Sequence, residues 1–110
     1  MLVHVPTAFA VLAEPQRRRI LDLLRESERP VGDLVDALQA SQPAVSKHLR
    51  VLREAGLVDV EVDAQRRIYR LRPEPLLELN DWLEPYRRMW ASRLDLLERH
   101  LDTTPDQEER

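Results

Sequence analysis

The sequence predicts a mainly α fold of the α+β class, in which one β-hairpin follows a set of helices. Apolar residues recur three or four positions apart over most of the 110-residue chain, and the spacing changes to two after Leu57. Glycine occurs only twice, so few tight turns are expected. The length suits one domain with a modest core, which we place over 1–102, and the polar residues 103–110 are expected to be disordered.

The first two helices are expected on either side of a proline. A short N-terminal helix is predicted over 7–14, with the Thr7 hydroxyl capping its first turn. Pro15 suits the first position of the next helix, because the N–H that proline lacks would have no partner there. Helical spacing of apolar residues then continues until residues 27–30 interrupt it, and this second helix opens a helical core over 15–56.

A helix-turn-helix pattern follows in the middle of the chain. A short third helix is predicted over 32–39, then a tight turn, then a fourth helix over 42–55. Ser41 is a favourable N-cap for the fourth helix, and Gly56 ends it as the residue best able to adopt a positive φ.

Residues 57–72 predict a β-hairpin directly after the fourth helix. Three valines at 58, 60 and 62 alternate with three acidic residues, which indicates a half-buried strand. Residues 64–66 form the expected turn, and 67–71 form the returning strand. A hairpin in this position is the wing of a winged helix-turn-helix.

The last helix is predicted over 75–101, with Pro85 either kinking it or splitting it in two. It carries more apolar surface than the small core can absorb, so we expect it to pair with its symmetry mate and with the N-terminal helix. The alternatives are that it folds back on its own domain, or that Trp82, Tyr86 and Trp90 line a pocket for a small apolar effector. The predicted dimer interface comprises Phe9, Leu12, Leu83, Tyr86, Trp90, Leu94, Leu97 and Leu101.

The net charge of −3 hides an uneven distribution. Residues 41–72 carry seven basic and four acidic side chains, whereas 73–110 carry five basic and ten acidic ones. A local cationic segment can still hold phosphates, because salt screens charges more than about 8–10 Å away. Sixteen of the seventeen basic residues are arginine, so arginine alone is weak support for DNA contact.

The fourth helix predicts a DNA-reading surface. Val45, Leu49 and Leu52 share its core face, and the opposite face has no acidic residue before Glu54. Such a surface suits a B-DNA major groove about 12 Å wide, although a solvated helix face would show the same polarity. The order of helix, turn, capped helix and basic-tipped hairpin favours DNA. The predicted contacts are Gln42, Ser46, Lys47, His48, Arg50, Arg53, Arg66 and Arg67.

Two runs, 12–26 and 30–58, together resemble the ArsR-type (arsenic-repressor) family of bacterial winged helix-turn-helix regulators. The shared motifs are a Leu-Ala-x-Pro-x-Arg-Arg start, a Ser-Gln-Pro-x-Val-Ser-x-His-Leu core and a Leu-Arg-x-Ala-Gly-Leu-Val exit. The resemblance implies a homodimeric repressor that binds an inverted-repeat operator and releases it when an effector binds. It points to Gln42, Ser46, Lys47, His48 and Arg50 as DNA-facing. His48 could donate to a phosphate, pack where the helix meets the wing, or do neither.

The chain lacks the metal-binding residues of the metal-sensing members of this family. The stretch 31–35, which matches their Cys-x-Cys pair, has no thiol, and the chain has no cysteine at all. The last helix offers Asp95, Glu98 and His100 without a second histidine, and a site combining His4 with His100 across a dimer is disfavoured. We therefore expect no metal and no cofactor, and the effector is unknown.

Other function classes are less well supported by the sequence. An enzyme is not expected, because no nucleophile-base-acid set or phosphate-binding glycine loop is visible. A winged-helix protein-interaction module without DNA, or a metal-responsive repressor with an unrecognised site, remain as alternatives. Without a membrane-spanning run or secretory leader, a cytoplasmic, nucleoid-associated protein is expected.

Overall fold

The computed structural model describes residues 4–103, so the predicted tail lies outside the described residues except for Thr103, which is helical. The described residues divide into two compact units, one ending at Leu79 and the other beginning at Asn80. The single domain expected over 1–102 stays a prediction. No helix in the described range is long and apolar enough to cross a bilayer.

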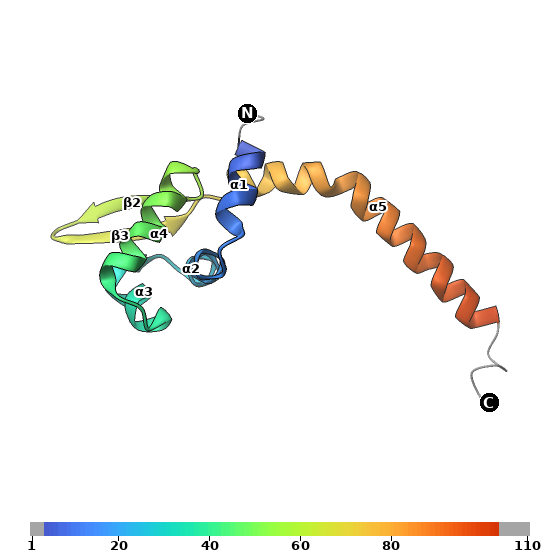
Figure 1. Ribbon diagram of the computed structural model, residues 1–110, viewed down its shortest axis with the longest axis horizontal. Helices are drawn as coiled ribbons and strands as arrows, with labels where there is room; N and C mark the ends of the chain where they lie inside the picture. Colours follow the sequence, from blue (N-terminus) through green and yellow to red (C-terminus); the bar gives the residue numbers. More distant parts are fainter. Residues whose placement is uncertain (1–3, 104–110) are drawn as a thin grey trace. The chain divides into compact units, whose positions relative to one another are not determined.

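Four helices precede the hairpin in the first unit (Figure 1). They are α1 (His4–Leu12), α2 (Pro15–Glu26), α3 (Val31–Leu38) and α4 (Gln42–Glu54).

Helix α1 begins three residues earlier than predicted, so Thr7 lies inside the helix and the prediction that it caps the first turn is wrong. The physical reason is Pro6, which occupies the first turn, where a helix tolerates a missing N–H. Pro15 occupies the first position of α2, as predicted, and the Glu14 carboxylate accepts the Gln16 N–H at 2.7 Å.

A three-stranded antiparallel sheet has the order β1-β3-β2, with β1 at Arg29–Pro30, β2 at Val58–Asp63 and β3 at Arg66–Leu71. The sequence predicted the hairpin but not β1, which pairs Arg29 with Tyr69 and Pro30 with Ile68. A two-residue strand containing proline has no detectable alternation, so sequence periodicity cannot reveal it.

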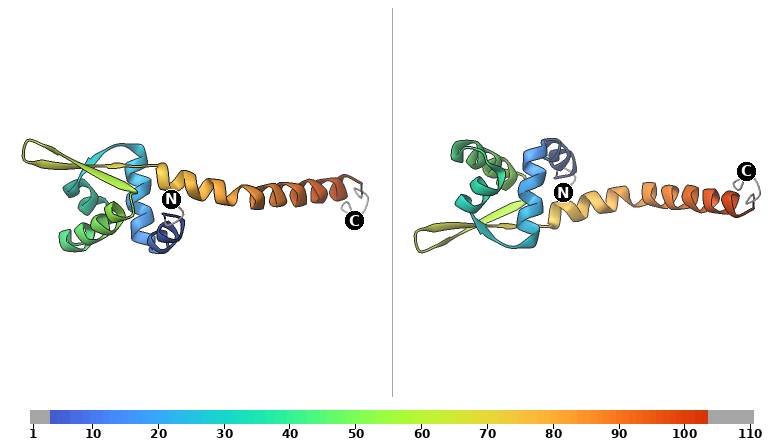
Figure 2. Two further views of the ribbon diagram at one scale, coloured as in Figure 1. Left: turned by 90° about the horizontal axis from the view of Figure 1, so that it is seen from above. Right: turned by 90° about the horizontal axis from the view of Figure 1, so that it is seen from below.

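The hairpin turn is shorter than predicted. Arg66 already pairs with Asp63, which leaves Ala64 and Gln65 as a two-residue loop. Ala64 has a φ of 59°, the left-handed conformation that such loops demand at their first position. Figure 2 shows the hairpin reaching past α3 and α4 within this unit.

The core of the first unit lies between the helices and the inner face of the sheet. Ile20, Leu34 and Leu52 are fully buried, and Tyr69 contributes its ring from β3 with 7% of its surface exposed. The core holds the inner face of α4 and leaves the outer face open.

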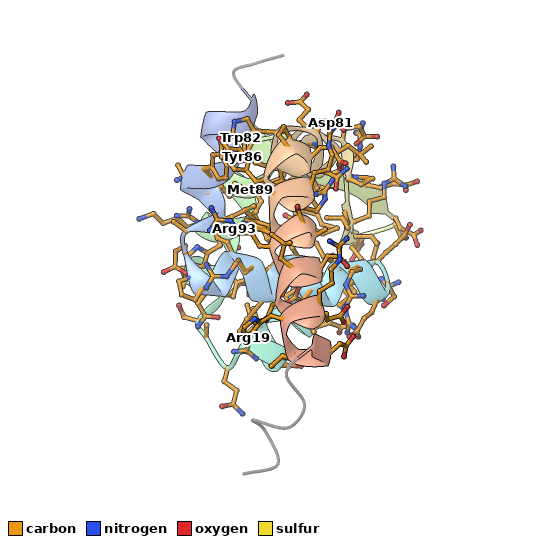
Figure 3. The ribbon with its side chains drawn as sticks, turned by 90° about the vertical axis from the view of Figure 1, so that its right-hand side faces the viewer. Arg19, Asp81, Trp82, Tyr86, Met89 and Arg93 are labelled. Atoms are coloured by element: carbon orange, nitrogen blue, oxygen red, sulfur yellow. The ribbon has the colours of Figure 1, made fainter. Side chains whose placement is uncertain are left out.

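The second unit contains most of α5 (Glu74–Thr103), a single helix that Pro85 does not split. Figure 3 shows Trp82, Tyr86, Met89 and Arg93 along one side of this helix, and the Trp82 and Tyr86 rings lie 5.0 Å apart. Among the predicted interface residues, Leu12 and Leu83 are half-buried. The others are exposed: Phe9, Tyr86, Trp90, Leu94, Leu97 and Leu101.

Candidate nucleic-acid interface

Two local motifs fix the ends of α4, the helix predicted to read DNA. The Ser41 hydroxyl accepts the Ala44 N–H at 3.3 Å, which confirms the predicted N-cap. At the other end, the Gly56 N–H donates to the Arg53 carbonyl at 2.9 Å, and the Leu57 N–H donates to the Leu52 carbonyl at 3.0 Å. This is a Schellman motif, and the φ of 78° at Gly56 meets its requirement for a left-handed residue.

The turn between α3 and α4 determines where the N-terminus of α4 lies. Gln39 caps α3 in the left-handed conformation with a φ of 54°, and Ala40 and Ser41 complete the turn. Val45, Leu49 and Leu52 then anchor α4 in the core with at most 1% exposure. Because these residues share one face, the polar side chains of α4 are held outward.

The outer face of α4 and the wing enclose a groove of about 520 Å³. Of its nine lining side chains, four are cationic and none is acidic. The groove is lined by Val31, Gln42, Pro43, Ser46, Lys47, Arg50, Arg53, Arg67 and Tyr69. Six of the eight predicted DNA-contact residues therefore lie together, and Arg66 and His48 do not line the groove.

Strand pairing separates the two arginines at the wing tip. Arg67 pairs with Val62, on the same sheet face as Tyr69, whereas Arg66 pairs with Asp63 on the other face. Only Arg67 therefore joins the groove, a distinction that the sequence did not predict because the turn was placed one residue too long.

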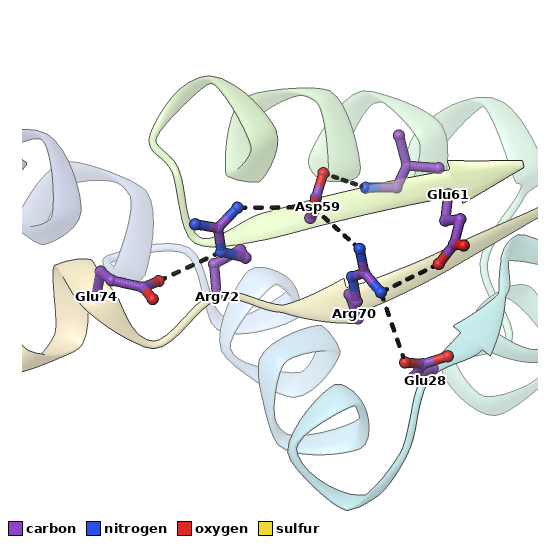
Figure 4. Close-up of polar contacts among 7 residues, drawn as sticks. Glu28, Asp59, Glu61, Arg70, Arg72 and Glu74 are labelled. Atoms are coloured by element: carbon purple, nitrogen blue, oxygen red, sulfur yellow. Dashed lines mark hydrogen bonds and ion pairs between the residues drawn. The ribbon is translucent and has the colours of Figure 1, made fainter.

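Two acidic side chains of β2, Asp59 and Glu61, form ion pairs on the face of the sheet that carries Arg70 (Figure 4). Arg70 lies 3.5 Å from Asp59, 3.1 Å from Glu61 and 4.0 Å from Glu28. Arg72 adds a second partner for Asp59 at 3.6 Å. Arg70 and Arg72 therefore compensate the charge of these carboxylates.

Asp59 accepts a backbone hydrogen bond in addition to its ion pairs. The Val60 backbone N–H donates to it at 2.8 Å, and this hydrogen bond, aided by Arg70 and Arg72, holds the pKa of Asp59 below its ordinary value. Asp59 therefore stays ionised and keeps both arginines on its own face of the sheet.

His48 lies on the flank of α4 and contacts α2. It is half-buried, and the Arg17 Nε–H donates to its Nδ1 at 3.3 Å. Sequence reasoning did not single out Arg17, although it belongs to the Pro-x-Arg-Arg motif at the start of α2. Its pairing with a residue 31 positions away left no periodic signal.

Within residues 4–103, the structure contains no cluster of three or more His, Asp or Glu side chains that could hold a metal ion. Asp95, one of the groups considered for such a site, pairs with Arg99 at 2.7 Å.

A capped helix behind a tight turn, followed by a two-stranded wing, defines a winged helix-turn-helix protein. The family model described as "Bacterial regulatory protein, arsR family" matches residues 14–60. With the relatives described next, this match shows that the chain belongs to the ArsR family of bacterial regulatory proteins.

Relatives of similar sequence include two proteins from Mycobacterium tuberculosis. The transcriptional regulator Rv2034 is 36% identical over 99 residues, which cover 90% of each chain. The transcriptional repressor SmtB is 46% identical over 68 residues, or 62% of this chain, and the match spans half the length of that relative.

A solved structure from Mycobacterium bovis has the same fold. It is a homodimeric winged helix-turn-helix DNA-binding domain determined by NMR, and it is 27% identical to this chain. The superposition has a TM-score of 0.65 and covers 84% of this chain and 85% of the other.

Proposed function

We propose that this protein is a sequence-specific DNA-binding transcriptional regulator that acts as a homodimeric repressor. The observation that carries the proposal is the groove between α4 and the wing, where four cationic side chains meet without an acidic one. The names of the relatives, transcriptional regulator and transcriptional repressor, agree with it.

The N-terminal half of α4 would enter the major groove. Gln42 can pair with an adenine edge, Lys47 and Arg50 with guanine edges or phosphates, and Ser46 with either. Arg53 and Arg67, further along the groove, would meet the phosphate backbone. Direct base contacts are thus assigned to the N-terminal half of α4, and backbone contacts to Arg53 near its C-terminus and to Arg67 of the wing.

A two-fold dimer would present two such helices about 34 Å apart, one turn of B-DNA, to the halves of an inverted repeat. The exposed apolar side chains of α5 supply a surface for that pairing, and the M. bovis domain is homodimeric. A dimer bound over a promoter would block transcription, and such a protein would act in the cytoplasm at the nucleoid.

The test begins with the promoter of the protein's own gene. Footprinting locates the operator, and affinities are then compared for Lys47→Ala, Arg50→Ala and Arg25→Ala, where Arg25 is an exposed arginine on α2 that does not line the groove. We expect losses of about 1–3 kcal/mol for the first two and little change for the third. Wild-type binding should fall steeply with salt.

Equal affinities for all three variants would contradict the assignment of α4 to the major groove. An absence of salt-sensitive binding to any promoter fragment would instead favour an interaction module that uses the winged-helix fold without DNA.

A further inference from the structure

We propose that Arg17 is a positioning residue for the DNA-reading helix, acting through His48, and that it fixes the His48 imidazole in the tautomer protonated on Nε2. The inference rests on the proposed DNA-binding function. It deepens that function, because it gives a role in DNA binding to a residue that does not itself line the groove. It assigns to α2 a part in setting the orientation of α4.

The guanidinium of Arg17 links three helices. Its Nε–H donates to His48 Nδ1 on α4 at 3.3 Å, and its Nη1 donates to the Val11 carbonyl near the end of α1 at 3.2 Å. Both Arg17 and His48 are half-buried, so these hydrogen bonds are partly shielded from water. Because the guanidinium is planar and rigid, fixing Nη1 on Val11 also fixes the direction in which Nε–H points.

The direction of donation determines the state of the imidazole. Arginine has donors only, so the Nδ1 that it contacts must carry a lone pair. A neutral imidazole then carries its proton on Nε2, since the hydrogen bond at one ring nitrogen selects the tautomer at the other. The Nε2–H edge, on the far side of the ring from Arg17, is left as a donor.

His48 is well placed to transmit position to the groove. It follows Lys47, which lines the groove, and precedes Leu49, which is 1% exposed in the core. Core packing fixes the depth of α4, and a hydrogen bond on the flank resists rotation about the helix axis. Loss of that bond allows Lys47 and Arg50 to shift together relative to the DNA.

Arg18 provides a matched control. Its Nη1 donates to the Leu12 carbonyl at 2.6 Å, so Arg18→Ala also removes one positive charge and one hydrogen bond to the end of α1. Arg17→Ala additionally removes the contact with α4. The difference between the two variants therefore isolates the hydrogen bond to His48.

The first experiment needs no DNA. A long-range ¹H–¹⁵N correlation spectrum of the free wild-type protein, recorded near pH 8 where free imidazole is neutral, reports the tautomer of each histidine. The His48 signals are identified by their absence from the His48→Asn variant. We expect the Nε2–H pattern in wild type and in Arg18→Ala, and a shift toward a tautomer mixture in Arg17→Ala. An Nδ1–H pattern for wild-type His48 would overturn the proposal.

The second experiment is a double-mutant cycle on operator affinity. Arg17→Ala should weaken binding about threefold to thirtyfold, which lies within the coupling expected for residues in contact, and Arg18→Ala less than about twofold. In a His48→Ala background, Arg17→Ala should cost no more than Arg18→Ala does, because only its hydrogen bond to the end of α1 is then lost. In a His48→Asn background its effect should return, because the Asn Oδ1 lies near the position of Nδ1 and can accept from Arg17.

The outcomes separate this proposal from the function on which it rests. Equal losses for Arg17→Ala and Arg18→Ala, or additive effects of Arg17→Ala and His48→Ala, overturn the positioning role while leaving DNA binding in place. If no operator is bound, the proposed function fails and the positioning role fails with it, whereas the tautomer assignment is still decided by the spectrum.

Discussion

Arg66 and Arg67 lie on opposite faces of the wing although they are neighbours at its tip. The pleat of β3 turns their side chains to opposite faces, and only Arg67 lines the groove beside Lys47 and Arg50. Arg66 stands opposite Asp63, an acidic neighbour that reduces its attraction for a phosphate.

Arg67→Ala should therefore weaken operator binding by roughly 1.5 kcal/mol, the lower end of the range for a hydrogen bond to a charged group, and reduce the salt slope by about one. Arg66→Ala removes the same charge and should cost less than half as much. Titrations at several salt concentrations measure both. Equal losses would mean that the tip contacts DNA through general charge and that the strand pairing has no bearing on it.

Ala64 holds the tightest backbone position of the wing. Its φ of 59° places an L-residue in a conformation that costs roughly 1–2 kcal/mol, which glycine avoids. Ala64→Gly should stabilise the protein by about 0.5 kcal/mol after the greater chain entropy of unfolded glycine is deducted. Gln65→Gly, at the adjacent position, should destabilise it. Thermal unfolding of both variants tests the turn geometry, and a loss of stability in Ala64→Gly would contradict it.

At the scale of elements, α4 could be predicted closely from the sequence, because its signals are local. Ser41 and Gly56 mark its ends, and its apolar residues have a clear helical period. The short strand β1 and the ion pair between Arg70 and Glu28 could not be predicted, since they join residues about 40 positions apart that show no shared pattern. Six lining residues of the groove were predicted for the same reason, because they come from α4 and the wing, whereas the contact from Arg17 was missed.

The ion pairs of Asp59 with Arg70 and Arg72 lead us to predict how the stability of the protein changes in acid. The pKa of Asp59 is lowered in the folded state, so its contribution to stability is present above the ordinary aspartate pKa of about 3.9 and is lost as the pH falls through the folded value. Asp59→Asn should therefore flatten the loss of stability below about pH 4.

Urea unfolding between pH 6 and pH 3 measures that effect. Asp63→Asn is the matched control, because Asp63 lies at the tip of the same strand, beyond the pairs made by Arg70 and Arg72. A pH profile for Asp59→Asn that follows the wild type would show that these ion pairs do not contribute to acid sensitivity.

At the scale of the whole molecule, the exposed apolar side chains of α5 beyond Leu79 indicate that this helix binds a partner. Trp90 and Leu97 are 50% and 54% exposed, and with the neighbouring apolar residues they form a band along the helix. At 100° per residue the band spans about 140°, which is wide enough for more than one helix of a second copy to pack against it. Leaving such a surface in water would favour association, so pairing with a second copy accounts for the band without an additional protein.

Leu97→Glu should break this pairing, since it places a carboxylate near the centre of the band, where a dimer would bury it without a partner. Ala91→Glu adds the same charge about 120° away on the same helix and should leave the dimer intact. Sedimentation at micromolar concentration should give twice the chain mass of 12.9 kDa for wild type and Ala91→Glu, and the single mass for Leu97→Glu.

Leu97→Glu should also lose most of its affinity for a full inverted repeat while retaining weak binding to a half-site, because its groove is unchanged. A wild-type monomer at these concentrations, or a dimer that survives Leu97→Glu, would contradict pairing through α5.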